Sequence, residues 1–595
     1  MSAGVRAAAL AALFVVMSVP VAVAAPPDPF GHPCLPTAGV RFCPTVDLAQ
    51  RVPAFDGVPL DVDVTLPPAG DGPFPAVVLL HGYSQSKETF LALNADGTPR
   101  PGSAGLDNVA LAQRGYLVVN PSARGFGRSC GAPSSRTAGC ERGWIHLADQ
   151  RYEVRDVQDL LGRLVDQGLV APDRIGASGI SYGGGQSLAL AFLRDRIREP
   201  EGFYRPWTSP RGTPLRLAVA APVIPWADLA SALLPNGRFR DGRAPGTTES
   251  RDPVGVPIRS FIDLLYNAGA ATGFVAPAGA DPGADLAAWR TRTAQGEPLG
   301  ADVDRILDEL YTFHGALAIP GTPAPLRISN GWTDDLFPVS QALRVYDRIR
   351  AANRTAPITL GFADFGHPRG TNKPTTTAAE ARANIAFLDA YLRGVGTRPR
   401  PGSVTALLQT CPASRPDAGP VAAASWTALH PGALSTRVDG RQLVTSPGGD
   451  PQLGREFDPV SGAASCKTVR TARSRDTASV RVRHRRAFTY LGRATVAARI
   501  RTSGSAYGQL AARLWEERGG RQRLIDRGVY RLTRNQRGDV RFQLNGNGYR
   551  FAAGTGVRLE LLGSDAPYFQ RTKGAFRVRV EDLSVTLPTR ERRPG

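Results

Sequence analysis

The feature that most restricts the fold is a serine placed between an apolar strand and a helix. Residues 174–185 read RIGASGISYGGG, which contains the Gly-x-Ser-x-Gly pattern centred on Ser181, and the apolar run Leu188–Ala191 predicts a helix after it. A serine at a tight strand-to-helix turn needs small neighbours, which Gly179 and Gly183 supply. A glycine-rich turn can contain serine by chance, but the strand and helix on either side indicate that Ser181 is a nucleophile.

From about residue 55 to residue 394 the chain alternates apolar strands with helical segments. We expect strands near 76–80, 116–120, 175–179, 215–225, 326–330 and 358–362, and helices near 151–164, 184–193, 339–349 and 378–392. This alternation predicts a doubly wound, mostly parallel sheet covered on both faces. With the serine at the end of a strand, the pattern is that of the α/β-hydrolase fold.

Two changes along the chain mark the domain organisation. About 98 residues separate the strand ending near Trp226 from the strand starting near Leu326, far more than a usual connection. After residue 400, short alternating segments separated by turns predict two packed β-sheets. We therefore predict a signal peptide (1–24), a first core segment (25–226), an inserted helical cap (227–324), a second core segment (325–400) and a C-terminal all-β domain (401–595).

The N-terminus has the three parts of a secretory signal peptide. Arg6 precedes an apolar run over residues 7–25, which ends in the small residues Ala22-Val23-Ala24. The alternative is a membrane anchor, but Pro20 and the small residues favour cleavage after Ala24. The sequence thus predicts a secreted, extracellular protein.

An exported protein can form disulfides, and the six cysteines fall into three neighbouring sets: Cys34/Cys43, Cys130/Cys140 and Cys411/Cys466. Six cysteines allow 15 connectivities, and the short loops within the first two sets make local bridges the easiest choice. Because no set has the Cys-x-x-Cys spacing of a zinc site, we expect no metal site.

The net charge of +20 is concentrated at the C-terminus. Residues 1–400 carry 39 basic and 37 acidic side chains, whereas residues 401–595 carry 33 basic and 15 acidic ones. An anionic partner such as an envelope polymer or nucleic acid is one interpretation. The other is a solvated arginine-rich sheet face, which the alternation of arginine with apolar residues favours. We expect weak contact with anionic cell-envelope polymers at most, and no nucleic-acid partner.

The base and acid that would activate Ser181 follow from chain order, because in an α/β-hydrolase the order is Ser, acid, His. His367 lies in a loop directly after the strand at 358–362, where the base belongs, and the other six histidines fall too early or in the β-domain. The loop after the strand at 326–330 reads GWTDDLFP, and its spacing selects Asp334 as the acid. Asp335 remains its main rival, and Asp364 is closer to His367 than an acid should be.

Two groups are expected to stabilise the negative oxygen of the reaction intermediate. The backbone N–H of Tyr182, which follows the nucleophile, is one donor. The buried strand at 76–80 ends in His81-Gly82-Tyr83, the usual site of the second donor. We expect His81 to shape this loop rather than to act as a base.

These motifs resemble the cocaine esterase and X-Pro dipeptidyl-peptidase family of serine hydrolases. The resemblance rests on GISYGG at 179–184, on His81-Gly82-Tyr83, on RGFGRS at 124–129 and on the order of the domains, and it covers most of the mature chain. It implies that the C-terminal domain is a jelly roll, whose strand reads LAARL at 510–514, and that the Tyr83 phenol donates to the oxyanion.

The resemblance implies a secreted serine hydrolase that cleaves acyl bonds in a small ester or peptide, like an X-Pro dipeptidyl-peptidase. The predicted cap, with 12 acidic and 8 basic side chains, tilts toward a substrate that bears an amine, although a solvated charged cap would look the same. Alternatives are a general carboxylesterase, an amino-acid ester hydrolase or acylase, and an inactive hydrolase fold that binds envelope polymers. No metal or organic cofactor is implied, and the sequence does not indicate an oligomeric state.

Overall fold

A computed structural model describes residues 1, 28–101, 105–238, 254–462 and 464–594. All of the predicted signal peptide at 1–24 except Met1 lies outside the described residues. Within the described ranges, no helix is both long and apolar enough to cross a bilayer.

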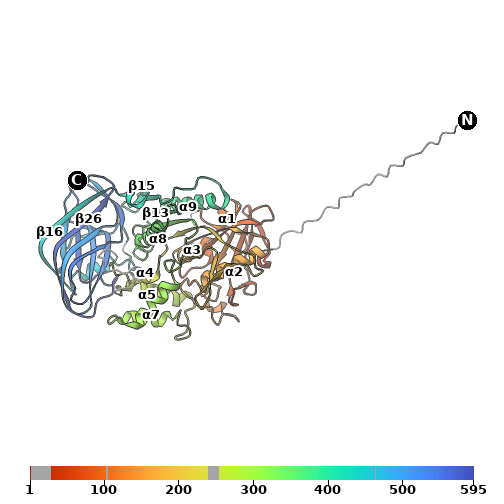
Figure 1. The fold of residues 1–595 in the computed structure, drawn as a ribbon, viewed down its shortest axis with the longest axis horizontal. Coiled ribbons are helices and arrows are strands. Elements are labelled where there is room, and N and C mark those ends of the chain that lie inside the picture. Colours follow the sequence, from red (N-terminus) through yellow and green to blue (C-terminus); the bar gives the residue numbers. More distant parts are fainter. Residues whose placement is uncertain (2–27, 102–104, 239–253, 463, 595) are drawn as a thin grey trace.

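A mixed sheet of eleven strands forms the centre of the N-terminal part (Figure 1). In spatial order its strands are β1 (Leu35–Thr37), β2 (Val40–Cys43), β5 (Val62–Leu66), β7 (Leu117–Pro121), β6 (Phe74–Leu80), β8 (Val170–Ile180), β11 (Leu217–Val223), β12 (Leu326–Gly331), β13 (Ile358–Ala363), β14 (Val404–Leu408) and β15 (Ala418–Ala423). The strands from β7 to β14 run parallel, and antiparallel strands extend both edges. The six strands expected from the sequence are all in this sheet.

Helices cover both faces of the sheet, which confirms the predicted α/β-hydrolase fold class. The apolar sides of α2 (Glu153–Asp166), α3 (Tyr182–Leu193) and α8 (Val339–Ala352) are buried with one face of the sheet. On the opposite face, buried residues of α1 (Asn108–Ala112) and α9 (Pro374–Leu388) pack against the strands. Parallel strands need this double cover because both of their faces are apolar.

The end of the large sheet corrects the boundary predicted at residue 400. Strand β14 pairs with β13 in parallel register, with Leu360 opposite Val404, and β15 adds an antiparallel edge that ends at Ala423. Both strands follow residue 400 and still belong to the α/β region. The turn-rich segment at 399–403 therefore leads into one more sheet strand and does not begin the β-domain.

Between β11 and β12 the described chain forms four helices on one side of the sheet, where α4, α5 and α7 are labelled in Figure 1. They are α4 (Leu229–Leu233), α5 (Arg259–Thr272), α6 (Leu286–Gln295) and α7 (Ala301–Phe313). Buried residues of this cap form one apolar cluster with Tyr182, Phe337 and the β-domain residue Val529. The cap thus packs on the residue that follows Ser181.

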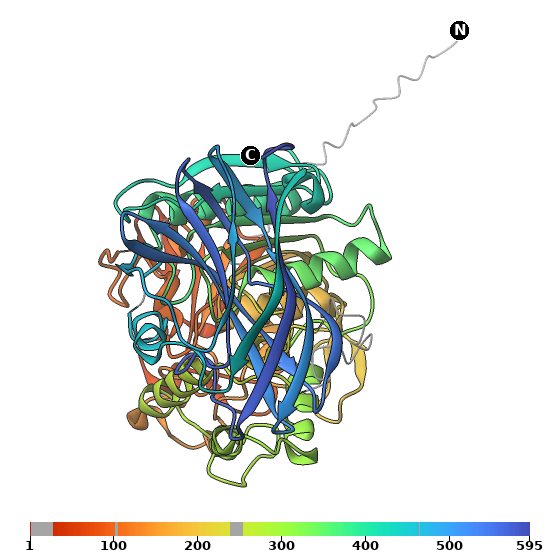
Figure 2. The same ribbon diagram turned by 90° about the vertical axis from the view of Figure 1, so that its left-hand side faces the viewer.

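The C-terminal part is a sandwich of two antiparallel sheets, as predicted (Figure 2). The inner sheet, which faces the α/β region, consists of β17 (Thr468–Arg470), β22 (Arg521–Leu532), β21 (Gly508–Arg518), β25 (Gly556–Leu562) and β18 (Ala478–Val482). The outer sheet consists of β23 (Arg537–Gln543), β20 (Thr495–Gly504), β26 (Phe576–Thr589), β19 (Phe488–Gly492), β24 (Asn547–Phe551) and β16 (Gly432–Thr445). An apolar core lies between the two sheets.

Smaller elements connect these parts of the chain. They are the strand pairs β3 (Val52–Pro53) with β4 (Pro59–Leu60) and β9 (Arg196–Arg198) with β10 (Tyr204–Pro206), and the helices α10 (Trp426–Leu429) and α11 (Pro451–Glu456). Short 3-10 or π-helical turns lie at Pro29–Gly31, Leu48–Gln50, Lys87–Phe90, Pro133–Ser135 and Asp389–Arg393.

Three disulfides join each cysteine to its neighbour in sequence: Cys34–Cys43, Cys130–Cys140 and Cys411–Cys466. The local bridges expected for the first two sets are confirmed. The third bridge joins the segment after β14 to the segment before β17. Three disulfides fit a protein that folds in an oxidising compartment.

Candidate active site

The turn between β8 and α3 presents Ser181 in a conformation that side chains rarely adopt. Ser181 has φ of 55° and caps the N-terminus of α3. A Cβ at Gly183 would lie 1.9 Å from the Leu80 carbonyl oxygen, and one at Gly179 would lie 2.6 Å from the same oxygen. Only glycine fits at both positions, so the spacing of the motif follows from the crowding of this turn.

Ser181, His367 and Asp334 come together from the ends of three strands. Ser181 follows β8, Asp334 follows β12 and His367 follows β13. The Ser181 Oγ lies 2.8 Å from the His367 Nε2, and the His367 Nδ1 lies 2.7 Å from the Asp334 Oδ2. The order nucleophile, base, acid is that of an activated serine.

The Asp334 carboxylate is fully buried and held from two sides. Its Oδ1 accepts the N–H groups of Leu336 and Phe337, and its Oδ2 accepts the His367 N–H at 3.2 Å in addition to the imidazole. Four contacts of this kind stabilise a buried anion. Since the imidazole Nδ1 must donate to this carboxylate, the His367 Nε2 is free to take the Ser181 proton.

The two rival acids have other partners. The Asp335 carboxylate receives two hydrogen bonds from Arg369, at 2.7 and 3.0 Å. Asp364 accepts the hydroxyls of Thr333 and Thr371. Of the three candidates, Asp334 is the one whose carboxylate contacts the His367 imidazole.

Tyr83 and Tyr182, which carry the predicted oxyanion donors, both line the hollow beside Ser181. The Tyr83 ring packs edge-on against Phe126 and Tyr182 and lines the same hollow as Ser181. Burial, together with the nearby Glu153 charge, raises the pKa of the Tyr83 phenol, so the phenol stays protonated as a donor. The Tyr182 N–H opens the first turn of α3, where helix N–H groups have no partner within the helix.

His81 shapes the loop beside the nucleophile, as the sequence predicts. Its Nδ1 donates to the Gly82 carbonyl at 2.7 Å, and its Nε2 accepts the Ala123 N–H at 2.9 Å. This arrangement requires the neutral ring, and burial lowers the pKa of His81 to about 4. Both ring nitrogens are therefore occupied, which leaves neither to act as a base on Ser181.

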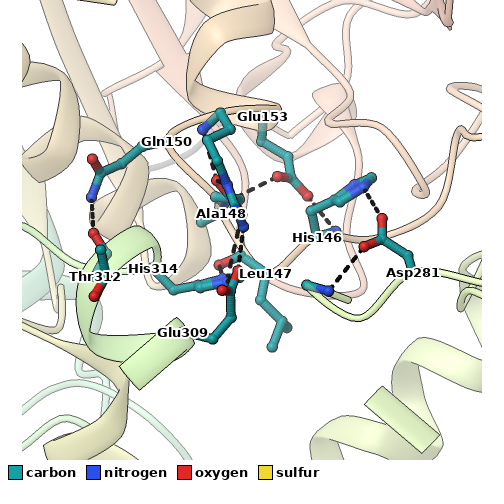
Figure 3. Close-up of polar contacts among 12 residues, drawn as sticks. His146, Leu147, Ala148, Gln150, Glu153, Asp281, Glu309, Thr312 and His314 are labelled. Atoms are coloured by element: carbon teal, nitrogen blue, oxygen red, sulfur yellow. Dashed lines mark hydrogen bonds and ion pairs between the residues drawn. The ribbon is translucent and has the colours of Figure 1, made fainter. Parts of the chain in front are cut away.

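A buried carboxylate that the sequence analysis missed, that of Glu153, holds the side chain of Tyr182. Figure 3 shows Glu153 beside His146. Glu153 accepts the Tyr182 hydroxyl at 2.8 Å and the N–H groups of His146 and Asp149. The Tyr182 hydroxyl in turn accepts the Ala148 N–H. Glu153 reads in the sequence as an ordinary acidic residue in the first turn of a helix, so no local signal identifies it.

One group of side chains has the composition of a metal site. The ligand atoms of Asp149, Glu309 and His314 lie within 4.8 Å of one another, at the contact between the core and α7 (Figure 3). The guanidinium of Arg151 pairs with both carboxylates. A cation of the protein itself therefore occupies the position between these acids, and the group joins the cap to the core.

Ser181 opens into a hollow of about 110 Å³ with an apolar wall. Most of the wall comes from leucine, isoleucine and aromatic residues of the cap and core: Leu147, Trp226, Leu229, Leu233, Leu234, Ile262, Leu265, Tyr266, Leu286, Trp289, Ile306, Leu307, Leu310, Leu336 and Phe337. Within the described part of the chain, the only charged side chain on this wall is that of Arg290.

Most of the described acidic residues of the cap pair with the protein's own basic groups. Asp263 pairs with Arg259 and Arg290, and Asp281 accepts from His146 and Trp144. Hydrogen bonds from His146 and Trp144 lower the pKa of Asp281 to about 2, although burial alone would raise it. The acidic excess of the cap thus stabilises the cap and its contacts with the core.

A family profile matches part of the chain. Residues 56–196 match the profile of a family described as X-Pro dipeptidyl-peptidase (S15 family). A search of curated proteins found no match.

Solved structures share the fold over nearly the whole chain. An aminopeptidase from a marine sediment archaeon, Thaumarchaeota archaeon, is 14% identical with a TM-score of 0.58 and covers 93% of this chain and 98% of its own. A CocE/NonD family hydrolase from Staphylococcus aureus is 13% identical with a TM-score of 0.55, over 92% and 94%. An α-amino acid ester hydrolase is 15% identical with a TM-score of 0.54, over 96% and 100%.

Proposed function

We propose that this chain, whose residues 56–196 match the X-Pro dipeptidyl-peptidase (S15) family and whose fold is shared with a CocE/NonD family hydrolase, is an exported serine hydrolase that acts as a carboxylesterase for short apolar acyl groups. The observation that carries this proposal is the apolar hollow beside Ser181. Export is supported by the three disulfides and by the signal-peptide pattern of the sequence.

The proposed reaction uses Ser181 as the nucleophile and His367 as the base. His367 takes the hydroxyl proton as the Ser181 Oγ attacks the ester carbonyl, and Asp334 stabilises the imidazolium that forms. The Tyr83 phenol and the Tyr182 N–H donate to the oxyanion. His367 then returns the proton to the leaving alcohol, and water hydrolyses the acyl-enzyme by the same steps.

The dimensions of the hollow favour a short acyl chain. It encloses about 110 Å³, and a dry apolar cavity of roughly 150 Å³ is large enough for benzene. Each buried methylene contributes about 0.8 kcal/mol of binding until the space is filled. We therefore expect activity to rise from acetyl to butyryl esters and to fall for long chains.

A dipeptidyl-peptidase is the second candidate, and the family profile over residues 56–196 favours it. Such an enzyme must hold a cationic amine, and burying an unpaired ammonium in an apolar wall is costly. The described wall of the hollow presents Arg290 and no carboxylate. This charge pattern favours the esterase.

Kinetics on paired substrates test the proposal. We expect p-nitrophenyl butyrate to exceed p-nitrophenyl dodecanoate in kcat/KM by roughly tenfold or more, and Ile262→Ala to shift the preference toward longer chains. Val395→Ala, at an exposed site, is the matched control. Rapid cleavage of Ala-Pro-p-nitroanilide, lost on acetylation of its amine, would instead establish the dipeptidyl-peptidase. A wild-type protein that takes up no fluorophosphonate would indicate an inactive fold.

A further inference from the structure

A buried ion pair lies directly beside the Asp334–His367 hydrogen bond. Asp335 follows Asp334, and Arg369 comes two residues after His367. The Arg369 Nε and Nη2 donate to the two oxygens of Asp335 at 2.7 and 3.0 Å, and the two side chains are 2% and 0% exposed. Two parallel bonds of this kind fix the relative orientation of guanidinium and carboxylate.

This pair is a second bridge between the same two loops. The loop after β12 carries Asp334 and Asp335, and the loop after β13 carries His367 and Arg369. One carboxylate of the first loop meets the imidazole, and the next carboxylate meets the guanidinium. Because the two bridges lie so close in sequence, a shift of either loop would disturb both the Asp334–His367 contact and the Asp335–Arg369 contact.

The β-domain holds this bridge from the outside. The Tyr568 hydroxyl donates to the Asp335 main-chain oxygen at 2.7 Å. Arg527 of β22, whose side chain is fully buried, places its Nη1 3.6 Å from the Asp335 carboxylate and its guanidinium 4.4 Å from the Tyr568 ring centroid. Asp335 is thus fixed at both its side chain and its main chain by residues more than 190 positions away.

The groups around the Asp335–Arg369 pair are closely packed. The main chain at Gly366, one residue before His367, passes so close to Asp334 that a Cβ there would lie 2.5 Å from its carboxylate. Arg527 is also anchored by a hydrogen bond to the Phe457 carbonyl at 2.9 Å. A displacement of the Asp335–Arg369 pair would therefore be transmitted to the Asp334–His367 contact.

We infer that Asp335 and Arg369, held by Arg527 and Tyr568 of the β-domain, are positioning residues that align the Asp334–His367 pair for catalysis. They act through Asp334 and His367 and do not contact substrate. This inference rests on the proposed function. It makes the β-domain a part of the catalytic apparatus although it supplies no reacting group.

The effect of losing the bridge is expected in kcat. Misplacement of a catalytic group by about 1 Å costs on the order of 10²-fold in rate. Arg369→Met should therefore lower kcat by about that factor and change KM for p-nitrophenyl butyrate little, since the apolar hollow is unchanged. Arg369→Lys keeps the charge but loses the two-point geometry, so we expect it to recover only part of the rate.

The test measures Arg369→Met, Arg369→Lys and Tyr568→Phe, with kcat, KM and the pH profile of kcat/KM determined per folded active site. Arg558→Met is the matched control, because Arg558 forms a buried pair with Glu517 within the β-domain. We expect lower kcat and an altered pH profile in the Arg369 variants, a smaller loss in Tyr568→Phe, and a wild-type kcat in Arg558→Met.

Wild-type kcat and pH profile in folded Arg369→Met would overturn the inference, as would equal losses of kcat in Arg558→Met. If Arg369→Met does not fold, unchanged kinetics in both Arg369→Lys and Tyr568→Phe would overturn it instead. Fluorophosphonate labelling separates this result from failure of the proposed function. Wild-type protein that labels, with Ser181→Ala that does not, retains the proposed function whatever the Arg369 variants show.

Discussion

The inner and outer sheets of the β-domain both carry many arginines, and two groups of them lie in opposite environments. On the inner sheet, Arg513 and Arg527 are fully buried and lie beside Asp565 and Asp335. On the outer sheet, Arg501 lies directly opposite both Arg537 and Arg579, and all three are exposed. Within the described residues, no ion pair joins these three to a carboxylate.

The positive charge of arginine serves a different purpose in the interior than on the exposed sheet. A buried guanidinium must be paired, because an uncompensated charge in the interior is costly. Arginines directly opposite one another on an exposed sheet repel, so they do not stabilise the sheet. Arg527 therefore holds the β-domain to the active-site loop that carries Asp335, whereas Arg513 pairs with Asp565 within the β-domain. We propose that the outer arginines are available to anionic polymers in solution.

Removing the Ser181 hydroxyl is expected to have the largest effect on kcat. Ser181→Ala should reduce kcat for p-nitrophenyl butyrate by roughly 10⁶-fold, because activity without the nucleophile depends on the oxyanion donors and binding alone. The substitution removes one oxygen, so we expect the thermal unfolding curve to stay the same. Near wild-type turnover in this variant would show that the reaction does not use Ser181.

Removing one arginine from each sheet compares how much the two arginines contribute to the free energy of unfolding. Arg527→Met should lower the free energy of unfolding by about 3–5 kcal/mol, because it leaves the charge of Asp335 partly uncompensated in the interior. Arg579→Met, on the outer sheet, should change it by no more than about 0.5 kcal/mol. Urea denaturation measures both, and equal losses would contradict the comparison.

The dependence of stability on pH differs between the α/β region and the β-domain. The pKa of His81, in the α/β region, is lowered to about 4 by burial, so the unfolded chain binds this proton more readily between about pH 6.5 and pH 4. Burial raises the pKa of Asp526, in the β-domain, to about 6, so its protonation stabilises the fold between about pH 6 and pH 4.

Acid should thus weaken the contribution of His81 and strengthen that of Asp526. Relative to His81→Gln, the wild type should lose up to about 3 kcal/mol of stability as the pH falls from 7 to 4. Relative to Asp526→Asn, it should gain stability over the acid part of that range. Denaturant titrations at pH 7, 5.5 and 4 measure the slopes, and parallel slopes for all three proteins would refute both assignments.

The smallest expected effect concerns the outer sheet. We expect wild-type protein to be retained on immobilised dextran sulfate at low salt and released as salt rises past roughly 0.2 M, because exposed charges are screened. Replacing Arg501, Arg537 and Arg579 together by Gln should lower the salt needed for release. Arg437→Gln, which removes a charge already paired with Asp582, should change it less. Turnover of p-nitrophenyl butyrate should be the same in all of them.

Much of the α/β region could be predicted from its apolar pattern. Strands such as β6 and β13 are continuous buried runs, and the chemistry follows them at the end of each strand. Ser181 and His367 could be identified because glycine crowding and chain order leave few choices. The loop spacing favoured Asp334, but Asp335 stayed a rival because no local pattern shows that Arg369 binds the Asp335 carboxylate.

The features that the sequence analysis missed depend on distant partners. The arginine-rich sequence of the β-domain suggests a solvated face, yet Arg527 of strand β22 is buried beside Asp335, which lies 192 positions earlier in the chain. Strand β14 follows a turn that resembles a domain boundary, and only its register with β13 assigns it to the large sheet. The acidic cap suggested an amine site because its pairing with arginines is not visible in a count of charges.

The Cys411–Cys466 disulfide has a consequence for limited proteolysis. Its two halves lie on either side of the crossing from the α/β region to the β-domain, and the chain between them includes β15 and β16. A protease that cuts within 412–465 therefore cannot release either fragment, because the bridge still joins them covalently. Such a cut would leave a single band on a non-reducing gel and two bands after reduction.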